Sequence, residues 1–218
     1  MPVFILVTGA NGVGKTTFID DNFLALRESG FEIIIPDRIL KRPHSLDKDI
    51  SIMEHLYDCV SRGVDFVFET PFQFNTFART LDLIYSKGYI MVLYQLFVNT
   101  LDESALRVID RYRKGGLSID PEIVKANFNA NFQNVARYYF YFQTSYFIDN
   151  SILGSSKLLA AFKKMALVYH QTNNSSYLWH LFNYSASIRR MDDGAMKIIK
   201  ANAHVISPEW EIDSDFVS

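Results

Sequence analysis

The sequence has little cysteine, no long apolar run and no segment typical of export. Its one cysteine, Cys59, cannot form a disulfide within the chain, which favours a reducing compartment such as the cytoplasm. We expect Cys59 to be a small core residue in a helix. The longest apolar run, 89–98, contains Gln95 and has only strand length, so no membrane-spanning helix is expected. Residues 1–7 carry no basic segment and are too short for a signal peptide.

An excess of charge of either sign is also absent. Lys and Arg number 22 against 24 Asp and Glu, giving a net charge of −2, so no nucleic-acid partner is expected. With 49% hydrophobic and 21% charged residues, the chain has the composition of a globular protein, which excludes a disordered or collagen-like one. Its 218 residues suit one α/β domain.

Apolar runs of strand length alternate with helical patterns along the first 150 residues. Strands are predicted at 3–8, 32–35, 65–68, 90–97 and 145–149. This alternation predicts a three-layer α/β/α sandwich with a mainly parallel, five-stranded sheet. After Gly154 the pattern predicts a helix at 157–163 and a short edge strand at 166–170. We expect a main domain over 1–182 and a C-terminal extension over 183–218 that packs on it or trails from it.

The segment GANGVGKT at 9–16 lies between the first predicted strand and the first predicted helix. It matches the phosphate-binding P-loop, in which backbone amides bind phosphate oxygens at a helix N-terminus. Lys15 is expected to bind the β- and γ-phosphates of ATP, and the Thr16 hydroxyl to coordinate Mg²⁺. The predicted nucleotide-binding residues are Gly9, Asn11, Gly12, Val13, Gly14, Lys15, Thr16 and Thr17. The chain lacks an Asn-Lys-x-Asp guanine reader and is small, which favours a P-loop kinase.

Acidic residues follow several of the predicted strands, where ligands bind in parallel α/β sheets. Asp37 is the candidate general base, with a helix N-cap as its alternative role. Glu69 is a candidate either for the coordination shell of Mg²⁺ or, beside Thr70, for binding the acceptor. Its alternative role is a structural ion pair with an arginine. Asp149 is expected to cap a turn.

A predicted helix at 101–114 carries Arg107, Arg111 and Lys114 on one face and ends at a Gly-Gly pair, 115–116. A basic face beside a glycine hinge is typical of a lid that closes over a triphosphate and supplies an arginine to the transition state. The alternative is a solvated helix face. The residues expected to bury on the opposite side are Ala105, Val108, Ile109 and Tyr112.

Together these segments resemble the zeta-toxin family of P-loop kinases over residues 3–151. The residues that carry the resemblance are Gly9 to Thr17, Pro36 to Ile39, Phe68 to Thr70, Lys87 to Tyr89, Ala105 to Val108, Arg111, Gly115-Gly116, Asn134 and Asp149 to Ser151. The resemblance implies transfer of phosphate from ATP to an alcohol group of a small molecule, such as the sugar hydroxyl of UDP-N-acetylglucosamine. It also implies an antitoxin-like protein partner.

By this resemblance Asp37 activates the acceptor, Glu69 and Thr70 line the acceptor pocket, and Arg111 stabilises the transferring phosphate. Arg107, on the same helix face as Arg111, is also expected to bind substrate. The sequence departs from the family pattern at Leu117, Asn127, Asn131 and Pro71-Phe72. These departures leave a second reading open, in which the chain binds nucleotide without kinase activity and acts through a protein partner, with the aromatic stretch 128–147 as its surface. That stretch is more readily explained as core, because its helical spacing gives it a buried face.

Overall fold

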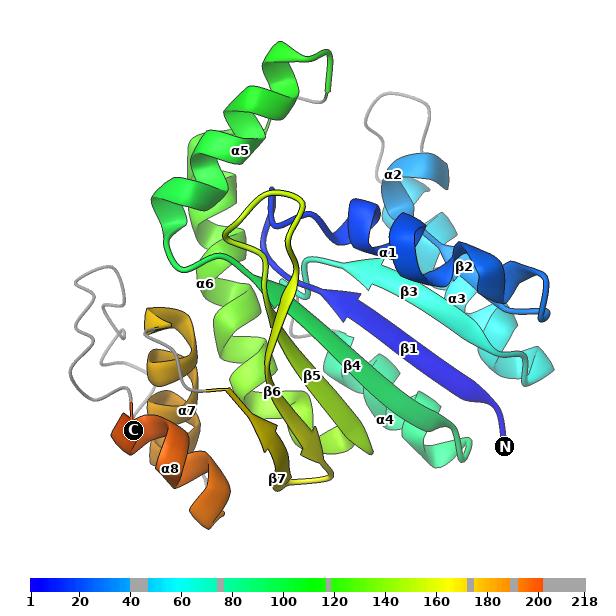
Figure 1. The fold of residues 1–218 in the computed structure, drawn as a ribbon. Coiled ribbons are helices and arrows are strands. Elements are labelled where there is room, and N and C mark those ends of the chain that lie inside the picture. Colours follow the sequence, from blue (N-terminus) through cyan, green and yellow to red (C-terminus); the bar gives the residue numbers. More distant parts are fainter. Residues whose placement is uncertain (40–46, 74–76, 117–118, 172–174, 189–191, 202–218) are drawn as a thin grey trace.

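A computed structural model describes residues 1–39, 47–73, 77–116, 119–171, 175–188 and 192–201. Its centre is one sheet with the strand order β2-β3-β1-β4-β5-β6-β7 (Figure 1). The strands β1 to β5 pair in parallel, and β6 and β7 are added antiparallel at one edge. The bounds are β1 Val3–Thr8, β2 Glu32–Ile34, β3 Phe66–Thr70, β4 Ile90–Phe97, β5 Thr144–Asp149, β6 Lys157–Lys163 and β7 Ala166–His170.

The five predicted parallel strands are confirmed, but the described sheet has seven strands rather than five. The prediction of a helix at 157–163 was wrong, because this segment forms the strand β6. Its leucines and alanines are good helix formers, yet antiparallel pairing with β5 buries Leu159 to Phe162 in the sheet. The edge strand predicted at 166–170 is confirmed as β7.

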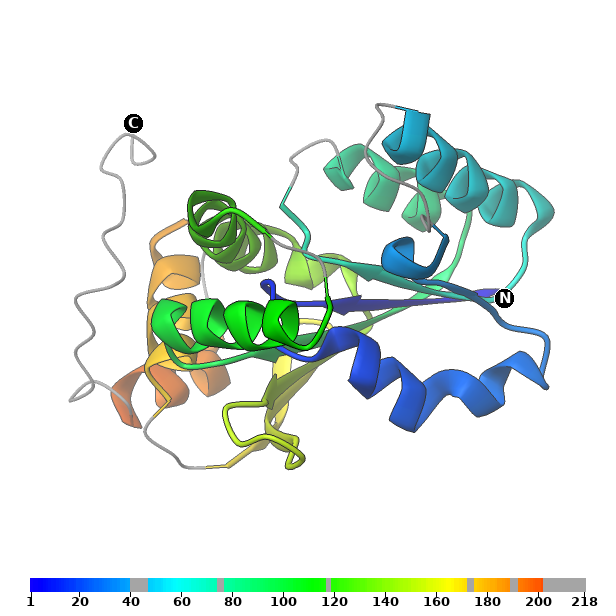
Figure 2. The ribbon, with the colours of Figure 1, turned by 90° about the horizontal axis from the view of Figure 1, so that it is seen from above.

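Helices cover both faces of the sheet (Figure 2). One face carries α1 (Lys15–Phe23) with the 3₁₀ turn Leu24–Arg27. The other carries α3 (Asp47–Arg62), α4 (Phe77–Ser86), α6 (Pro121–Tyr138) and α7 (Ser176–Ile188), with α8 (Asp193–Ala201) against α7 and β7. Beyond the carboxyl ends of the strands lie α2 (Pro36–Ile39) and α5 (Leu101–Arg113), as Figure 1 shows.

Two apolar clusters fill the space between the layers, one on each face of the sheet. The larger lies under α3, α4, α6 and α7, and at its centre the buried ring of Phe147 contacts the rings of Phe162 and Phe182. The aromatic residues of α6 and of the 3₁₀ turn Tyr139–Tyr141 belong largely to these clusters. The prediction that the aromatic stretch is core is therefore confirmed for Phe128, Phe132 and Tyr139.

The C-terminal part is described only as far as residue 201. The expected boundary between 182 and 183 falls within α7, and the division into a domain and an extension stays a prediction. Residues 202–218 of the expected extension lie outside the described residues, as does Leu117. None of the helices described here combines the length and apolarity needed to cross a membrane.

Candidate active site

A cavity of about 710 Å³ opens at the carboxyl ends of the parallel strands, between the P-loop, α2 and α5. Strand register brings its parts together, because Thr8 at the end of β1 lies level with Thr70 of β3 and Gln95 of β4. The predicted site residues that line the cavity are Asn11, Gly12, Gly14, Lys15, Thr16, Thr17, Asp37, Glu69, Arg107 and Arg111. Lys114, which the basic-face prediction also includes, lines it too.

The P-loop presents an open helix N-terminus to this cavity. Gly14, the N-cap of α1, has φ +89° and provides no side-chain cap, so the first amides of the helix remain available to an anion. A Cβ at Gly14 would lie 2.6 Å from Nδ2 of Asn150. The Asn150 amide itself donates a 2.6 Å hydrogen bond to the carbonyl of Val13, which fastens the loop to the end of β5. This contact needs a residue without a side chain at position 14.

Lys15, Thr16 and Glu69 form a compact polar group at the floor of the cavity. The Lys15 ammonium donates a 3.0 Å hydrogen bond to the carbonyl of Ala10, and the Thr16 hydroxyl donates one of 2.8 Å to Oε2 of Glu69. Burial lowers the pKa of Lys15, and the carboxylates of Glu69 and Asp37 oppose that shift. Burial raises the pKa of Glu69, opposed by the charge of Lys15. The two groups therefore stabilise each other's charged forms in a place that water barely reaches.

Asp37 and Arg111 face each other across the mouth of the cavity. Asp37 lies in the first turn of α2, and its Oδ2 is 3.8 Å from Nη1 of Arg111 on α5. Both side chains are partly exposed, 57% for Asp37 and 41% for Arg111, so this ion pair is loose and open to exchange with a ligand. Nε of Arg111 is buried and has no hydrogen-bond partner among the residues described.

The helix α5 is capped at its N-terminus and packs against the P-loop. Thr100 caps it by accepting a hydrogen bond from the amide of Glu103, whose carboxylate accepts one from the amide of Asn99. Ser104 donates a 2.6 Å hydrogen bond to the carbonyl of Asn11. A Cβ at Gly12, which has φ +78°, would lie 2.7 Å from the Ser104 carbonyl, so only glycine permits this approach.

The predicted basic face of α5 is confirmed in position, since Arg107, Arg111 and Lys114 all line the cavity. Arg107 also donates a 2.6 Å hydrogen bond to the carbonyl of Ser151. The predicted apolar face was wrong for Ile109 and Tyr112, whose exposed fractions are 43% and 56%. The reason is that α5 lies against the phosphate loop rather than against the sheet, and mainly Val108 and Ser104 are buried there.

The remaining predicted residues lie around the cavity rather than in its lining. Val13 is fully buried beneath the P-loop, and Gly9 passes close to the carbonyl of Leu96. Thr70 accepts a 3.0 Å hydrogen bond from the amide of Phe72. The prediction that Asp149 caps a turn is confirmed, because it accepts hydrogen bonds from both the amide and the hydroxyl of Ser151. Among the residues described, Glu69 forms no ion pair with an arginine.

Sequence reasoning named Asn127, Asn131 and Asn134 one by one but missed that they form a row of buried side chains on α6. Asn127 donates a 2.8 Å hydrogen bond to Oδ1 of Asn11 in the P-loop. Asn131 donates to the Thr8 hydroxyl and to the carbonyl of Pro71, and so joins β1 to the turn after β3. Asn134 donates to the carbonyl of Phe72. The signal was present in the sequence as polar residues at i, i+4 and i+7 of an otherwise aromatic helix.

The Pro71-Phe72 pair does not crowd the cavity with its larger ring. Phe72 is 1% exposed and packs against Phe77 and Tyr138, and only Pro71 lines the cavity. Phe72 has φ +54°, a strained conformation for a residue with a side chain. Its amide and carbonyl are held by Thr70 and Asn134, so the turn after Glu69 has a fixed shape.

The chain has an α/β fold of the P-loop kinase-like type. No family model matches the chain, and no curated protein matches it in sequence. Solved structures do match in fold. A complex of AvrRxo1-ORF1 with AvrRxo1-ORF2 aligns with a TM-score of 0.59 at 13% identity, over 94% of this chain and 76% of that chain. The same pair with ATP aligns with a TM-score of 0.57 at 14% identity, over 96% and 78%.

A third similar structure comes from the PezAT chromosomal toxin–antitoxin system of Streptococcus pneumoniae. It aligns with a TM-score of 0.52 at 18% identity, over 97% of this chain and 88% of that chain. At identities this low, the TM-scores and coverages show a shared fold alone.

Proposed function

We propose that this chain is an ATP-dependent kinase that transfers the γ-phosphate to a hydroxyl of a small molecule, with a nucleotide sugar such as UDP-N-acetylglucosamine as the candidate acceptor. The observation that carries this proposal is the single cavity in which the P-loop, two carboxylates and the cations of α5 meet. The ATP bound in the similar AvrRxo1 complex supports ATP as the nucleotide. The buried Nε of Arg111, which has no hydrogen-bond partner in the described part of the chain, supports a phosphate ligand on this side.

In this proposal Asp37 accepts the proton of the acceptor hydroxyl as its oxygen bonds to the γ-phosphorus. The bond from that phosphorus to the bridging oxygen of ADP breaks, and ADP leaves. Lys15 and the N-terminal amides of α1 bind the phosphates throughout, and Arg111 neutralises charge on the transferring group. The ion pair between Asp37 and Arg111 keeps these two groups at the mouth of the cavity before substrates bind.

The residues beside Lys15 fit a magnesium ion. Thr16 offers a hydroxyl oxygen, and the buried residue Glu69 offers a carboxylate; Mg²⁺ prefers oxygen ligands of this kind. When bound, Mg²⁺ would neutralise negative charge on the β- and γ-phosphates. Thr16 would hold the ion, and Glu69 would orient the Thr16 hydroxyl or bind a water of the ion's shell.

Replacing Glu69 with Gln is expected to weaken the apparent Mg²⁺ affinity of the nucleotide complex by about 10- to 100-fold. The amide keeps the shape of the side chain and removes the negative charge. The measurement is a Mg²⁺ titration of the binding of a fluorescent ATP analogue. Glu122→Gln, an exposed acid in the first turn of α6, is the matched control and should titrate as the unaltered chain does. Equal titrations of both variants would remove Glu69 from the ion's surroundings.

The proposed function is tested by following both products of the transfer. The full chain is incubated with ATP, Mg²⁺ and a panel of nucleotide sugars, and ADP and phosphorylated acceptor are measured by coupled assay and mass spectrometry. At least one acceptor is expected to yield the two products in equal amounts. Omitting the acceptor separates transfer from plain ATP hydrolysis.

A second candidate function is a nucleotide-binding module that acts through a protein partner. It is favoured by exposed apolar side chains on α5 beside the cavity, with exposed fractions of 64% for Leu106, 43% for Ile109 and 56% for Tyr112. The AvrRxo1 pair and the PezAT toxin–antitoxin system, both similar in fold, support a partner of antitoxin type. ATP binding without transfer to any acceptor of the panel would favour this candidate over the kinase.

A further inference from the structure

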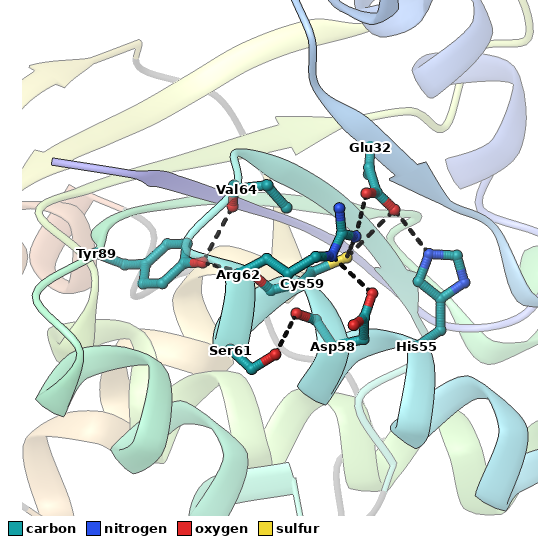
Figure 3. Close-up of polar contacts among 8 residues, drawn as sticks. All are labelled: Glu32, His55, Asp58, Cys59, Ser61, Arg62, Val64 and Tyr89. Atoms are coloured by element: carbon teal, nitrogen blue, oxygen red, sulfur yellow. Dashed lines mark hydrogen bonds and ion pairs between the residues drawn. The ribbon is translucent and has the colours of Figure 1, made fainter.

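Three potential metal ligands from two elements meet at the edge of the sheet away from the cavity. Glu32 begins β2, and His55 and Cys59 lie four residues apart on α3, so they share one face of that helix. One ligand atom from each residue lies within 4.8 Å of the other two. Figure 3 shows the side chains converging, with the carboxylate of Glu32 between the imidazole and the thiol.

The separations suit a small tetrahedral ion. Oε2 of Glu32 is 2.9 Å from Nε2 of His55 and 3.4 Å from Sγ of Cys59. Nitrogen, oxygen and sulfur ligands on one zinc ion lie about 3.3 to 3.6 Å apart, given their bond lengths to the metal. Small rotations of the partly exposed Glu32 and His55 side chains, 32% and 41% exposed, would open the required space.

Neighbouring residues hold these ligands in place. Arg62 contacts Oε1 of Glu32, which leaves Oε2 directed at His55 and Cys59 (Figure 3). The Arg62 guanidinium also donates a long hydrogen bond of 3.9 Å to Sγ of Cys59, which the thiolate would keep as a ligand of the ion. Asp58 accepts a 2.8 Å hydrogen bond from Nε of Arg62 and balances its charge. The Tyr89 hydroxyl donates to the carbonyl of Cys59 and so fixes the backbone of α3 at the ligand. Such supporting contacts are typical of metal sites.

We propose that Glu32, His55 and Cys59 bind Zn²⁺, with a fourth position open to water. A carboxylate and a thiolate neutralise the two positive charges of the ion, and this mixture of oxygen, nitrogen and sulfur ligands is one that zinc accepts. The partly exposed Glu32 and His55 side chains give the ion a path from solvent.

The zinc ion would tie an edge strand to a helix. Within the described sheet β2 pairs only with β3, over three residues, and α3 packs beside it. Glu32 stands at the start of β2, whereas Asp37 follows its other end, so the zinc site is separate from the active-site cavity. The expected effect of the ion is a more stable β2–α3 unit, independent of phosphate transfer.

The test uses the full chain stripped of metal by a chelator and titrated with Zn²⁺ or with Co²⁺ as a spectroscopic probe. One equivalent should bind, Zn²⁺ should raise the unfolding temperature, and Co²⁺ should give a thiolate charge-transfer band. Because the chain has a single cysteine, that band can arise only from Cys59. His55→Gln, at a partly exposed position that should fold normally, is expected to weaken Zn²⁺ binding by at least about tenfold.

Two variants serve as controls. Glu54→Gln removes an exposed acid from α3, and Glu69→Gln removes a buried acid of the active-site cavity. Both should bind Zn²⁺ with unchanged affinity. Equal affinity of His55→Gln and the unaltered chain, or a folded protein whose cobalt complex lacks the thiolate band, would overturn the proposal.

Discussion

Replacing Lys15 with Met is expected to lower the rate of ATP turnover by about 10²- to 10³-fold while the chain still folds. Met fills most of the space of the buried lysine stem but carries no charge to place on the β- and γ-phosphates. Lys15 is 8% exposed as a residue, and its ammonium donates a hydrogen bond to the carbonyl of Ala10, so the charge is already oriented before ATP binds. A fixed charge of this kind acts in the transition state without reorganisation.

The matched control is Lys114→Met. Lys114 lines the same cavity but its side chain is 73% exposed and paired with Asp110, so its loss should change turnover far less. ADP release and the binding of a fluorescent ATP analogue are measured for both variants. If Lys114→Met lost as much activity as Lys15→Met, the effect would reflect the net charge of the cavity rather than the placement of Lys15.

The same substitution should make stability depend more strongly on pH. Burial raises the pKa of Glu69 above its ordinary value of 4.5, and Lys15 opposes that shift. Without Lys15 the folded chain holds the Glu69 proton to higher pH than the unfolded chain does. The free energy of unfolding of Lys15→Met should therefore fall as pH rises above 4.5, until Glu69 ionises in the folded state as well. Adding Glu69→Gln to Lys15→Met should remove that fall, as denaturant titrations at several pH values would reveal.

The parallel half of the sheet could be predicted from sequence because its signals are local. An apolar strand, a glycine-containing turn and a helix follow one another at residues 3–23, and the P-loop pattern fixes their order. The carboxyl-end rule then placed Asp37 and Glu69 on the rim with Lys15, and the cavity lining includes all three.

Of the antiparallel edge, β7 was predicted as a short edge strand, but β6 could not be predicted in the same way. Residues 157–163 read Lys-Leu-Leu-Ala-Ala-Phe-Lys, and by local propensity alone they favour a helix. Pairing with β5 and β7 decides otherwise, and neither partner can be recognised from within the segment. The wrong prediction for the apolar face of α5 has a similar cause. Helical spacing shows which residues share a face, but it does not show whether that face packs on the sheet or on a loop.

Side chains that meet only in three dimensions were the hardest to anticipate. Asn131 connects the Thr8 hydroxyl, 123 positions away in the sequence, to the carbonyl of Pro71, 60 positions away. Because Asn131 lies on a helix rich in aromatic residues, its face of the helix was predicted to be buried in the core. That face is buried, but its asparagine amides hold the P-loop and the turn after Glu69 in place. Cys59 is likewise a buried helical residue, as predicted. Its thiol, however, donates a hydrogen bond to Glu32, which belongs to the strand β2.

Replacing Asp37 with Asn is expected to lower kcat for acceptor phosphorylation by about 10²- to 10⁴-fold, with little change in the affinity for ATP. The amide keeps the size of the side chain but cannot take the proton of the attacking hydroxyl. Asp37 lies at the mouth of the cavity, 57% exposed and 3.8 Å from Arg111, so the substitution leaves the core and the P-loop contacts intact. A fall in kcat at constant nucleotide affinity is the signature of a group that acts in the chemical step.

Asp110→Asn provides the comparison, because Asp110 lines the same cavity, has the same side-chain exposure of 57% and also pairs with a cation, Lys114. It should retain most of the activity, since its carboxylate belongs to α5 and does not follow a strand of the sheet. Steady-state kinetics with the acceptor identified by the product assay separate kcat from KM for each variant. An Asp37→Asn enzyme with normal kcat would exclude Asp37 as the base. Equal losses in both variants would instead indicate that negative charge at the mouth of the cavity, rather than one proton acceptor, sustains the reaction.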